Sequence, residues 1–103
     1  MKIVIAGAYA IGTHLARLLA RAHEDITLID PDGERLENIG ADYDLLTMQA
    51  SPTSVKALRE AGAASADLFI AVSPDESRNM NACILAHAIG TRKTVARIDN
   101  YEY

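Results

Sequence analysis

Near the start of the chain stands the sequence Ile3-Val4-Ile5-Ala6-Gly7-Ala8-Tyr9-Ala10-Ile11-Gly12. Its first four residues form a continuous apolar run, which is typical of a β-strand covered on both faces. A glycine then interrupts the run, and beyond Gly12 apolar residues recur at spacings of three and four, which predicts an amphipathic helix. A strand that turns through glycine directly into a helix is the first half of a unit that builds parallel sheets.

The same alternation continues along the rest of the chain. Four further apolar runs of strand length occupy residues 26–29, 45–48, 68–72 and 94–98. Helical segments separate them: residues 32–39, a segment with Ser51 as N-cap and Pro52 as first helical residue that ends before Gly62, and residues 75–89. Strict alternation of this kind predicts an α/β fold, a Rossmann-like doubly wound parallel sheet of five strands in the order 3-2-1-4-5.

The spacing of large apolar residues also predicts which helix faces reach the core. The expected core positions are Ile11, Leu15, Leu18, Leu19 and Ala22 in the first helix, Leu36 and Ile39 in the second, Val55, Leu58 and Ala61 in the third, and Met80, Ile84, Leu85 and Ala88 in the fourth.

Length and composition limit the classes of protein. The 103 residues suffice for one core, so we expect residues 1–103 to be a single domain. Such sheets usually close with a further helix and a sixth strand, so we also expect a fragment of a longer chain. The formal charge is −4, without a cluster of Lys and Arg, which argues against nucleic-acid partners. Cys83 is the single cysteine, which excludes an internal disulfide and favours a reducing cytoplasm. No apolar stretch approaches membrane-spanning length.

The glycine turn lies where a dinucleotide-binding turn belongs. In the G-x-G-x-x-G pattern the first glycine makes the turn, the second admits a pyrophosphate, and the third lets the helix pack on the strand. Gly7 and Gly12 match the first and third, but Tyr9 replaces the second. Its ring would crowd the volume where phosphate meets the helix N-terminus unless it turns outward, so we expect weakened binding.

An acid follows the second strand at the position expected for a ribose ligand. Asp30 comes 18 residues after Gly12 and would accept hydrogen bonds from the ribose hydroxyls of an adenosine while repelling a 2′-phosphate. The alternative reading is structural: the two glycines permit tight packing and Asp30 caps the next helix. Both readings remain open from the sequence.

The remaining chemically active residues have ordinary explanations. Cys83 lies on an apolar helix face and reads as a buried small hydrophobe. The three histidines lack metal-ligand spacing. Arg35 is expected on a charged surface, with contact to an adenine edge or a 2′-substituent as the alternative. Arg97 is a charge on an apolar strand, so it is expected to reach the carboxyl end of the sheet, a dimer partner or the phosphates, or to stay exposed.

Several of these segments resemble a known family. Residues 1–8, the Leu28-Ile29-Asp30 end of the second strand, and Ala71-Val72-Ser73 leading to Asn79-Met80-x-Ala82-Cys83 are similar to the nucleotide-binding regulatory domain of bacterial Trk/Ktr potassium uptake systems, also called RCK or KTN. The resemblance covers essentially the whole chain. It implies a cytoplasmic domain that forms homo-oligomers, binds NAD(H) or ATP/ADP, and controls a membrane potassium transporter at whose inner face it sits.

The resemblance also implies a set of nucleotide-binding positions. These are Gly7, Ala8, Tyr9, Ala10, Ile11 and Gly12 in the phosphate turn, Asp30 and Pro31 at the ribose, Gln49 and Ala50 against the adenine, Ser73 and Asn79 beyond the phosphates, and Arg97. The family more usually has aspartate or asparagine in place of Gln49. Ala10 stands where ATP-binding members often place an arginine, which favours NAD over ATP.

Three functions remain open at this stage. The first is a non-catalytic nucleotide sensor of potassium transport. The second is the cofactor half of an NAD-dependent oxidoreductase, which would have the same fold. The third is a ligand-free assembly module in which Tyr9 fills the former phosphate site. An unpaired edge at the fifth strand favours a homodimer in each case.

Overall fold

The computed structural model describes residues 1–99, and the terminal segment 100–103, expected to follow the fifth strand, lies outside the described residues. Five parallel strands form one sheet in the order β3-β2-β1-β4-β5. The elements in chain order are β1 (Lys2–Ala6), α1 (Ala10–Arg21), β2 (Asp25–Asp30), α2 (Gly33–Glu37), β3 (Leu46–Gln49), α3 (Val55–Glu60), the 3-10 turn η1 (Ala63–Ser65), β4 (Leu68–Ala71), α4 (Glu76–Ile89) and β5 (Lys93–Ala96). The predicted fold class and strand order are confirmed.

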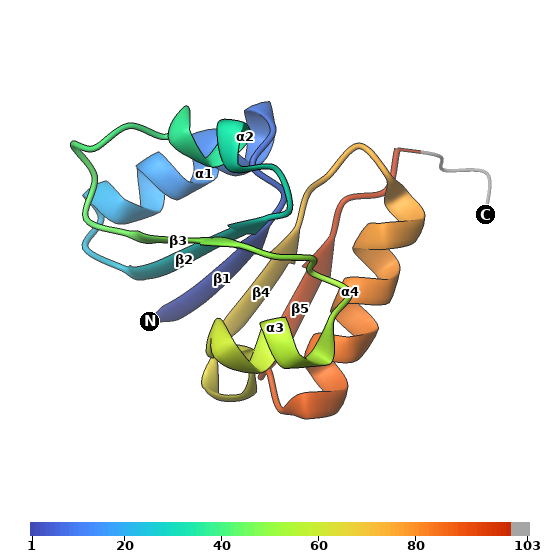
Figure 1. The fold of residues 1–103 in the computed structure, drawn as a ribbon. Coiled ribbons are helices and arrows are strands. Elements are labelled where there is room, and N and C mark those ends of the chain that lie inside the picture. Colours follow the sequence, from blue (N-terminus) through green and yellow to red (C-terminus); the bar gives the residue numbers. More distant parts are fainter. Residues whose placement is uncertain (100–103) are drawn as a thin grey trace.

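The helices cover the two faces of the sheet in pairs, α1 with α2 on one face and α3 with α4 on the other (Figure 1). Each pair encloses its own hydrophobic cluster, one around Ile3, Ile5 and Leu28, the other around Val4 and Phe69. The middle strand β1 alternates between the two clusters, as successive residues of a strand must. The chain passes to the other face of the sheet after β3, so the neighbouring strands β1 and β4 lead to helices on opposite faces, and their carboxyl ends lie between the two helix layers.

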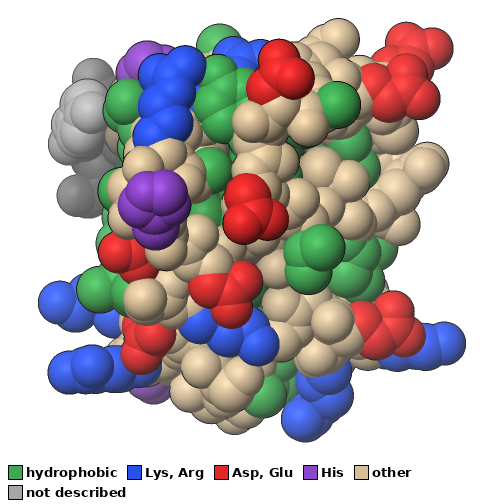
Figure 2. All heavy atoms as spheres, turned by 90° about the vertical axis from the view of Figure 1, so that its left-hand side faces the viewer, with side chains coloured by type: hydrophobic (Ala, Val, Ile, Leu, Met, Phe, Trp, Pro, Cys, Tyr) green, Lys and Arg blue, Asp and Glu red, His purple; other side chains and the backbone are tan. Residues whose placement is uncertain are grey.

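The third strand is less covered than its apolar composition predicts. β3 lies at one edge of the sheet, and Leu46 is 67% exposed. The expectation of a strand buried on both faces is therefore wrong for β3, and also for the opposite edge strand β5, where Val95 is 48% exposed. Figure 2 looks onto the side of the molecule that is on the left in Figure 1, where acidic and basic side chains are interspersed.

The first and fourth helices bury small residues rather than the large apolar ones. α1 buries Gly12, Thr13, Ala16 and Ala20, while Ile11 and Leu18 are exposed. α4 buries Asn79, Ala82, Cys83 and Ala86, while Met80 and Ile84 are exposed, Ile84 to 64%. The predicted core faces were wrong at these positions. Both helices approach the sheet closely, so the helix positions that face the sheet have room only for small side chains.

The third helix begins later than predicted. α3 starts at Val55, which is itself exposed, and its N-cap is Ser54, whose Oγ accepts a hydrogen bond from the Ala57 N–H at 3.2 Å. Ser51 and Thr53 instead bond to one another in the preceding turn, with Pro52 between them. The prediction of Ser51 as N-cap and Pro52 as first helical residue was wrong. Ser51 and Ser54, three residues apart, are both suitable N-cap residues, and the helix begins after the second of them.

Ala22 and Ala88, which were also expected in the core, are exposed, whereas other expectations hold. Leu36 and Ile39 of the second helical segment are buried, and α4 spans the predicted segment with Asp75 as its N-cap. Within residues 1–99, no helix is long and apolar enough to span a membrane.

Candidate functional site

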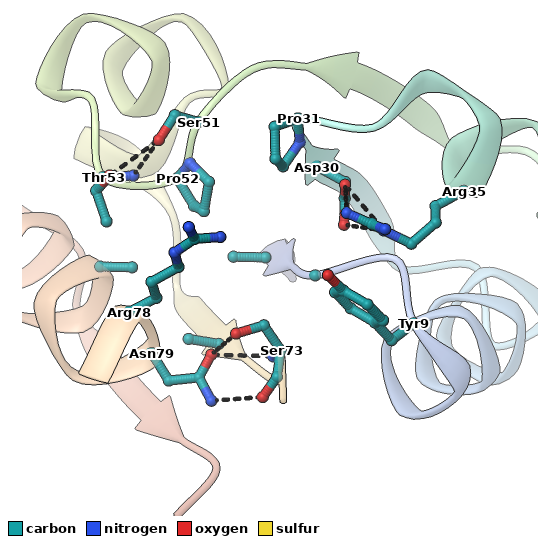
Figure 3. Close-up of a pocket in the computed structure, with 14 residues that line it drawn as sticks. Tyr9, Asp30, Pro31, Arg35, Ser51, Pro52, Thr53, Ser73, Arg78 and Asn79 are labelled. Carbon is teal, nitrogen blue, oxygen red and sulfur yellow. Dashed lines mark hydrogen bonds and ion pairs between the residues drawn. The ribbon is translucent and has the colours of Figure 1, made fainter. Parts of the chain in front are cut away.

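A cavity of about 240 Å³ opens at the carboxyl ends of β1, β2 and β4, between the two helix layers (Figure 3). One wall comes from the β1–α1 turn and the β2–α2 segment, the other from the β3–α3 loop and the start of α4. Its lining comprises Ala6, Gly7, Tyr9, Asp30, Pro31, Arg35, Ser51, Pro52, Thr53, Ala71, Ser73, Arg78, Asn79 and Ala82. The site thus occupies the position where ligands bind in open α/β sheets.

Glycine is required at positions 7 and 12, because other backbone atoms lie too close to leave room for a Cβ. Gly7 has φ +111°, and a Cβ there would lie 2.9 Å from the backbone nitrogen of Ser73. A Cβ at Gly12 would overlap the carbonyl oxygen of Gly7. These contacts bring α1 against the end of β1 and the turn against the β4–α4 loop. Packing alone explains both glycines, so they do not by themselves indicate a ligand.

The N-terminus of α1 differs from those of the other helices. Its N-cap is Tyr9, which makes no side-chain cap hydrogen bond, and its first turn carries no acid. The N-termini of α2, α3 and α4 are each capped by a side chain, from Asp32, Ser54 and Asp75. Free N–H groups and the helix dipole together favour an anion at this end of α1, where it meets the cavity.

Asp30 is the most completely bonded side chain of the site. It is 1% exposed. Its Oδ2 accepts from the Ala8 N–H at 2.8 Å, and its Oδ1 accepts from the Asp32 N–H at 2.7 Å. The Arg35 Nε–H donates to both oxygens, at 3.2 and 3.3 Å, and Arg35 Nη2 lies 3.1 Å from Oδ1. Asp30 therefore fastens the glycine turn, the turn before α2 and Arg35 to the end of β2.

Tyr9 turns toward α2 and stacks on Arg35. The guanidinium carbon of Arg35 lies 4.1 Å from the centre of the Tyr9 ring, a cation–π distance. Arg35 Nη1 also pairs with Asp32 at 3.0 Å. Hydrogen bonding to Asp30 raises the pKa of Arg35 above its ordinary value, so the group stays cationic. While stacked on Arg35, Tyr9 still lines the cavity, so the ring has not turned out of it.

Asn79 organises the opposite wall. Its Oδ1 accepts from the Ser73 N–H at 2.9 Å and from the Ser73 hydroxyl at 2.8 Å. Its Nδ2 donates to the carbonyls of Ser73 at 2.8 Å and Arg97 at 3.0 Å. Because an amide has two donors and two acceptor positions, all of its hydrogen bonds are used within the protein. Asn79 positions Ser73 rather than offering bonds to a ligand.

Arg78 reaches the cavity from the first turn of α4 (Figure 3). Its side chain is 66% exposed, and its ion pair with Asp75 is long, at 3.5 Å. Sequence reasoning missed this residue, because helix-dipole complementarity accounted for the charges around it. It also gave little weight to Ser51, Pro52 and Thr53, which line the cavity because α3 starts after them. The signal available was the position of Arg78, one residue before Asn79.

The structure brings together only some of the predicted site residues. Gly7, Tyr9, Asp30, Pro31, Ser73 and Asn79 line the cavity. The others lie beside or behind it. In the turn and the start of α1, Ala8 is buried, Ala10 and Ile11 are exposed, and Gly12 packs behind the turn. After β3, the Gln49 side chain donates to the Pro31 carbonyl at 3.4 Å and Ala50 donates its N–H to the Asp30 carbonyl, while Arg97 pairs with Asp99 at 3.0 Å. Arg97 was expected on the last strand, but it lies just beyond the carboxyl end of β5, so a charge on an apolar strand does not arise.

Residues outside the cavity agree with their ordinary explanations. Cys83 lies on the buried face of α4, and this burial raises the pKa of its thiol. The three histidines are exposed. Within the part of the chain that the structure describes, no group of three His, Cys, Asp or Glu is placed to hold a metal ion.

Comparison with known proteins places these features in context. A family model described as the TrkA-N domain matches residues 3–103. The chain is 44% identical to the Trk system potassium uptake protein TrkA of Haemophilus influenzae and 36% identical to a TrkA homolog of Archaeoglobus fulgidus, in each case over 100% of this chain and 23% of the relative. It thus spans about a quarter of the length of these relatives.

A solved structure shares the fold. The Kef CTD of Shewanella denitrificans, in its AMP-bound form, superposes with a TM-score of 0.74 at 18% sequence identity, over 92% of this chain and 57% of that one.

Proposed function

Because this chain belongs to the TrkA-N domain family, we propose that it is the nucleotide-binding regulatory domain of a Trk-type potassium uptake protein. One observation carries the proposal: a single cavity joins the uncapped N-terminus of α1 to a buried acid at the end of β2. An anion-binding helix end beside a ribose-binding acid is the arrangement that adenine nucleotides require. The names of the relatives favour potassium uptake over an oxidoreductase cofactor domain.

The proposed ligand is an adenine nucleotide laid along the carboxyl edge of the sheet. Its phosphates face the start of α1, its ribose faces Asp30, and its base lies toward Pro31 and Pro52. NAD(H) is favoured by the exposed Ala10, which offers no cation to a terminal phosphate. ADP or ATP is favoured by Arg78, whose guanidinium faces the cavity from the other wall. The AMP-bound Kef structure supports the nucleotide class.

In this proposal the chain binds nucleotide without consuming it. The full-length protein pairs such domains as a homo-oligomer at the cytoplasmic face of a membrane potassium transporter, and the bound ligand changes their spacing. A ligand shifts such an equilibrium only by its difference in affinity for the two arrangements. A coupling free energy of about 1–3 kcal/mol gives a several-fold to hundredfold effect on transport.

Replacing Tyr9 tests the proposal directly. We expect Tyr9→Gly to tighten the binding of NADH and ADP roughly tenfold, because the variant restores the missing glycine and frees Arg35 from its stacking partner. Glycine is accepted at an N-cap, so α1 should persist. The measurement is titration calorimetry of NADH, NAD⁺, ATP and ADP into both chains. Tyr43→Gly is the matched control, because Tyr43 also stacks on an arginine but lies outside the cavity.

Replacing Arg78 tests the placement of the phosphates. We expect Arg78→Gln to weaken ADP binding about fivefold while leaving adenosine binding unchanged, because a charge-assisted bond to phosphate is lost. Fluorescence or calorimetric titration with both ligands measures the difference. Arg92→Gln, an exposed arginine outside the lining, serves as control. Equal weakening of ADP and adenosine would place Arg78 against the base instead.

A ligand-free assembly module is the second candidate, and the bonding of Asp30 favours it. Arg35 and two backbone N–H groups already satisfy that acid, with Tyr9 covering Arg35. This reading predicts that neither the native chain nor Tyr9→Gly binds any nucleotide, while the chain still dimerises at micromolar concentration.

A further inference from the structure

The carboxylate of Asp30 has no acceptor position left for a ligand. An ionised carboxylate offers about four lone-pair sites, two on each oxygen. The N–H groups of Ala8 and Asp32 take one site on each oxygen, and Arg35 takes the others through Nε and Nη2. A ribose hydroxyl that donates to Asp30 must therefore displace one of these donors.

Only one of the three donors is able to leave. The two backbone N–H groups belong to the turns that follow β1 and β2, and the first of these turns is fixed by the close approach of Gly7 to the Ser73 backbone. Arg35 is a long side chain, 29% exposed, on the five-residue helix α2. Its second partner, Asp32, lies 3.0 Å from Nη1 and is 40% exposed, so that this ion pair is open to solvent. Arg35 is thus the movable donor.

Tyr9 holds that donor in place from the cavity side. The ring lies 4.1 Å from the guanidinium carbon, and both residues line the cavity. Figure 3 shows Arg35 bonded to Asp30 with the Tyr9 ring beside them. The guanidinium is therefore held between a carboxylate and an aromatic face, and both attractions have to be broken when it leaves.

We propose that Arg35 is a specificity-determining residue that competes with the ribose hydroxyls of the nucleotide for Asp30. This inference rests on the nucleotide-binding function proposed above. In the arrangement described here the acid is closed, and a ribonucleotide binds to the fraction of molecules in which Arg35 has turned away. The apparent affinity equals the intrinsic affinity multiplied by that open fraction. Arg35 therefore weakens the binding of every ligand that needs Asp30 and leaves the binding of a ligand without sugar hydroxyls unaffected.

Paired ligands and paired variants test the competition. Calorimetry compares ADP with 2′,3′-dideoxy-ADP on the native chain, on Arg35→Met and on Arg21→Met. Methionine keeps the apolar stem but donates no hydrogen bond. Arg21 is the matched control, because it bonds to the Tyr43 hydroxyl at 2.8 Å and stacks on that ring outside the cavity.

We expect Arg35→Met to raise the affinity for ADP on the order of tenfold. This factor corresponds to a native chain whose closed state is about ten times more populated than its open state. The affinity for dideoxy-ADP should change less than twofold, and Arg21→Met should change neither. If Arg35 only stabilised the local structure, its substitution would change the affinities for both ligands by a similar factor. Weaker ADP binding in Arg35→Met, or equal tightening of both ligands, overturns the inference while leaving nucleotide binding intact. Absence of binding in all three chains overturns the proposed function and this inference together.

A ligand-free measurement examines the closed state itself. In the proton–nitrogen NMR spectrum of the free chain, the Arg35 Nε–H should exchange with water at least several times more slowly than that of the exposed Arg78, and addition of ADP should abolish the difference. Equal exchange rates of Arg35 and Arg78 in the free chain would contradict the proposal.

Discussion

Gly12→Ala should destabilise the domain by roughly 3 kcal/mol or more, a large part of the 5–15 kcal/mol typical of the total free energy of unfolding. The added Cβ would overlap the carbonyl oxygen of Gly7 and also press on the Val72 side chain. A carbonyl fixed at the end of a central strand cannot move aside as a side chain does, so the whole of α1 has to shift outward. For a domain of this size the melting temperature should fall by more than about 10 °C. Thermal and urea unfolding, followed by circular dichroism, measure the change.

Gly33→Ala is the matched control for this substitution. Gly33 is the first residue of α2, and the nearest atoms to a Cβ there belong to the end of the Gln49 side chain, which can rotate away. Alanine also reduces the conformational entropy of the unfolded chain, so we expect a change within about 1 kcal/mol of zero. Similar melting temperatures for Gly12→Ala and the native chain would mean that α1 packs less tightly than described here.

The second large effect is expected at Asp30. Asp30→Ala should cost about 3 kcal/mol or more, because it leaves the Ala8 and Asp32 N–H groups without their acceptor and removes the buried partner of the Arg35 guanidinium. The loss extends over two turns, so the cavity should deform as the domain weakens. Urea unfolding gives the free energy, and titration with ADP gives the loss of nucleotide affinity.

Two comparisons make the Asp30 result specific. Asp75→Ala removes an exposed N-cap and should cost only about 1 kcal/mol. Adding Arg35→Met to Asp30→Ala should cost less than Arg35→Met costs alone, because the ion pair is already broken and neighbouring residues are not additive. If Asp30→Ala proves no more harmful than Asp75→Ala, the acid does not hold the two turns together.

The order of the elements was predictable from the sequence because apolar runs and glycine stops are local signals. β1, β2 and β4 each read as continuous apolar runs, and these central strands are buried. The buried faces of α1 and α4 were not predictable by the same method. Periodicity of large apolar residues indicated Ile11, Leu18 and Ile84, whereas the distance between helix and sheet selects Gly12, Ala16 and Ala82. That distance is a property of the assembled fold, not of any one segment.

The site was predictable in position but not in bonding. The acid Asp30 and the turn at Gly7 lie at the cavity where strand and glycine positions indicate. Arg35 was expected on a charged surface, with a contact to the nucleotide as the alternative, and Arg78 was not assigned to the site, since the direction of a long charged side chain depends on the folded surroundings as well as on its sequence neighbours. Arg35 turns inward because Asp30 pairs with its guanidinium and the Tyr9 ring stacks on it.

The bonds of Asn79 have a consequence for the opening of the domain. One amide group holds both the loop after β4 and the Arg97 carbonyl just beyond β5. The outermost strand of a sheet normally frays first and exchanges its amide protons fastest. Here fraying at that end of β5 breaks the bond from the Asn79 Nδ2 to the Arg97 carbonyl, and so loosens the amide whose other bonds hold Ser73 at the cavity. The amide protons of the cavity wall around Ser73 and those at the end of β5 should therefore be protected from exchange to a similar degree. A change at the cavity should alter the hydrogen exchange of the sheet edge, and the reverse.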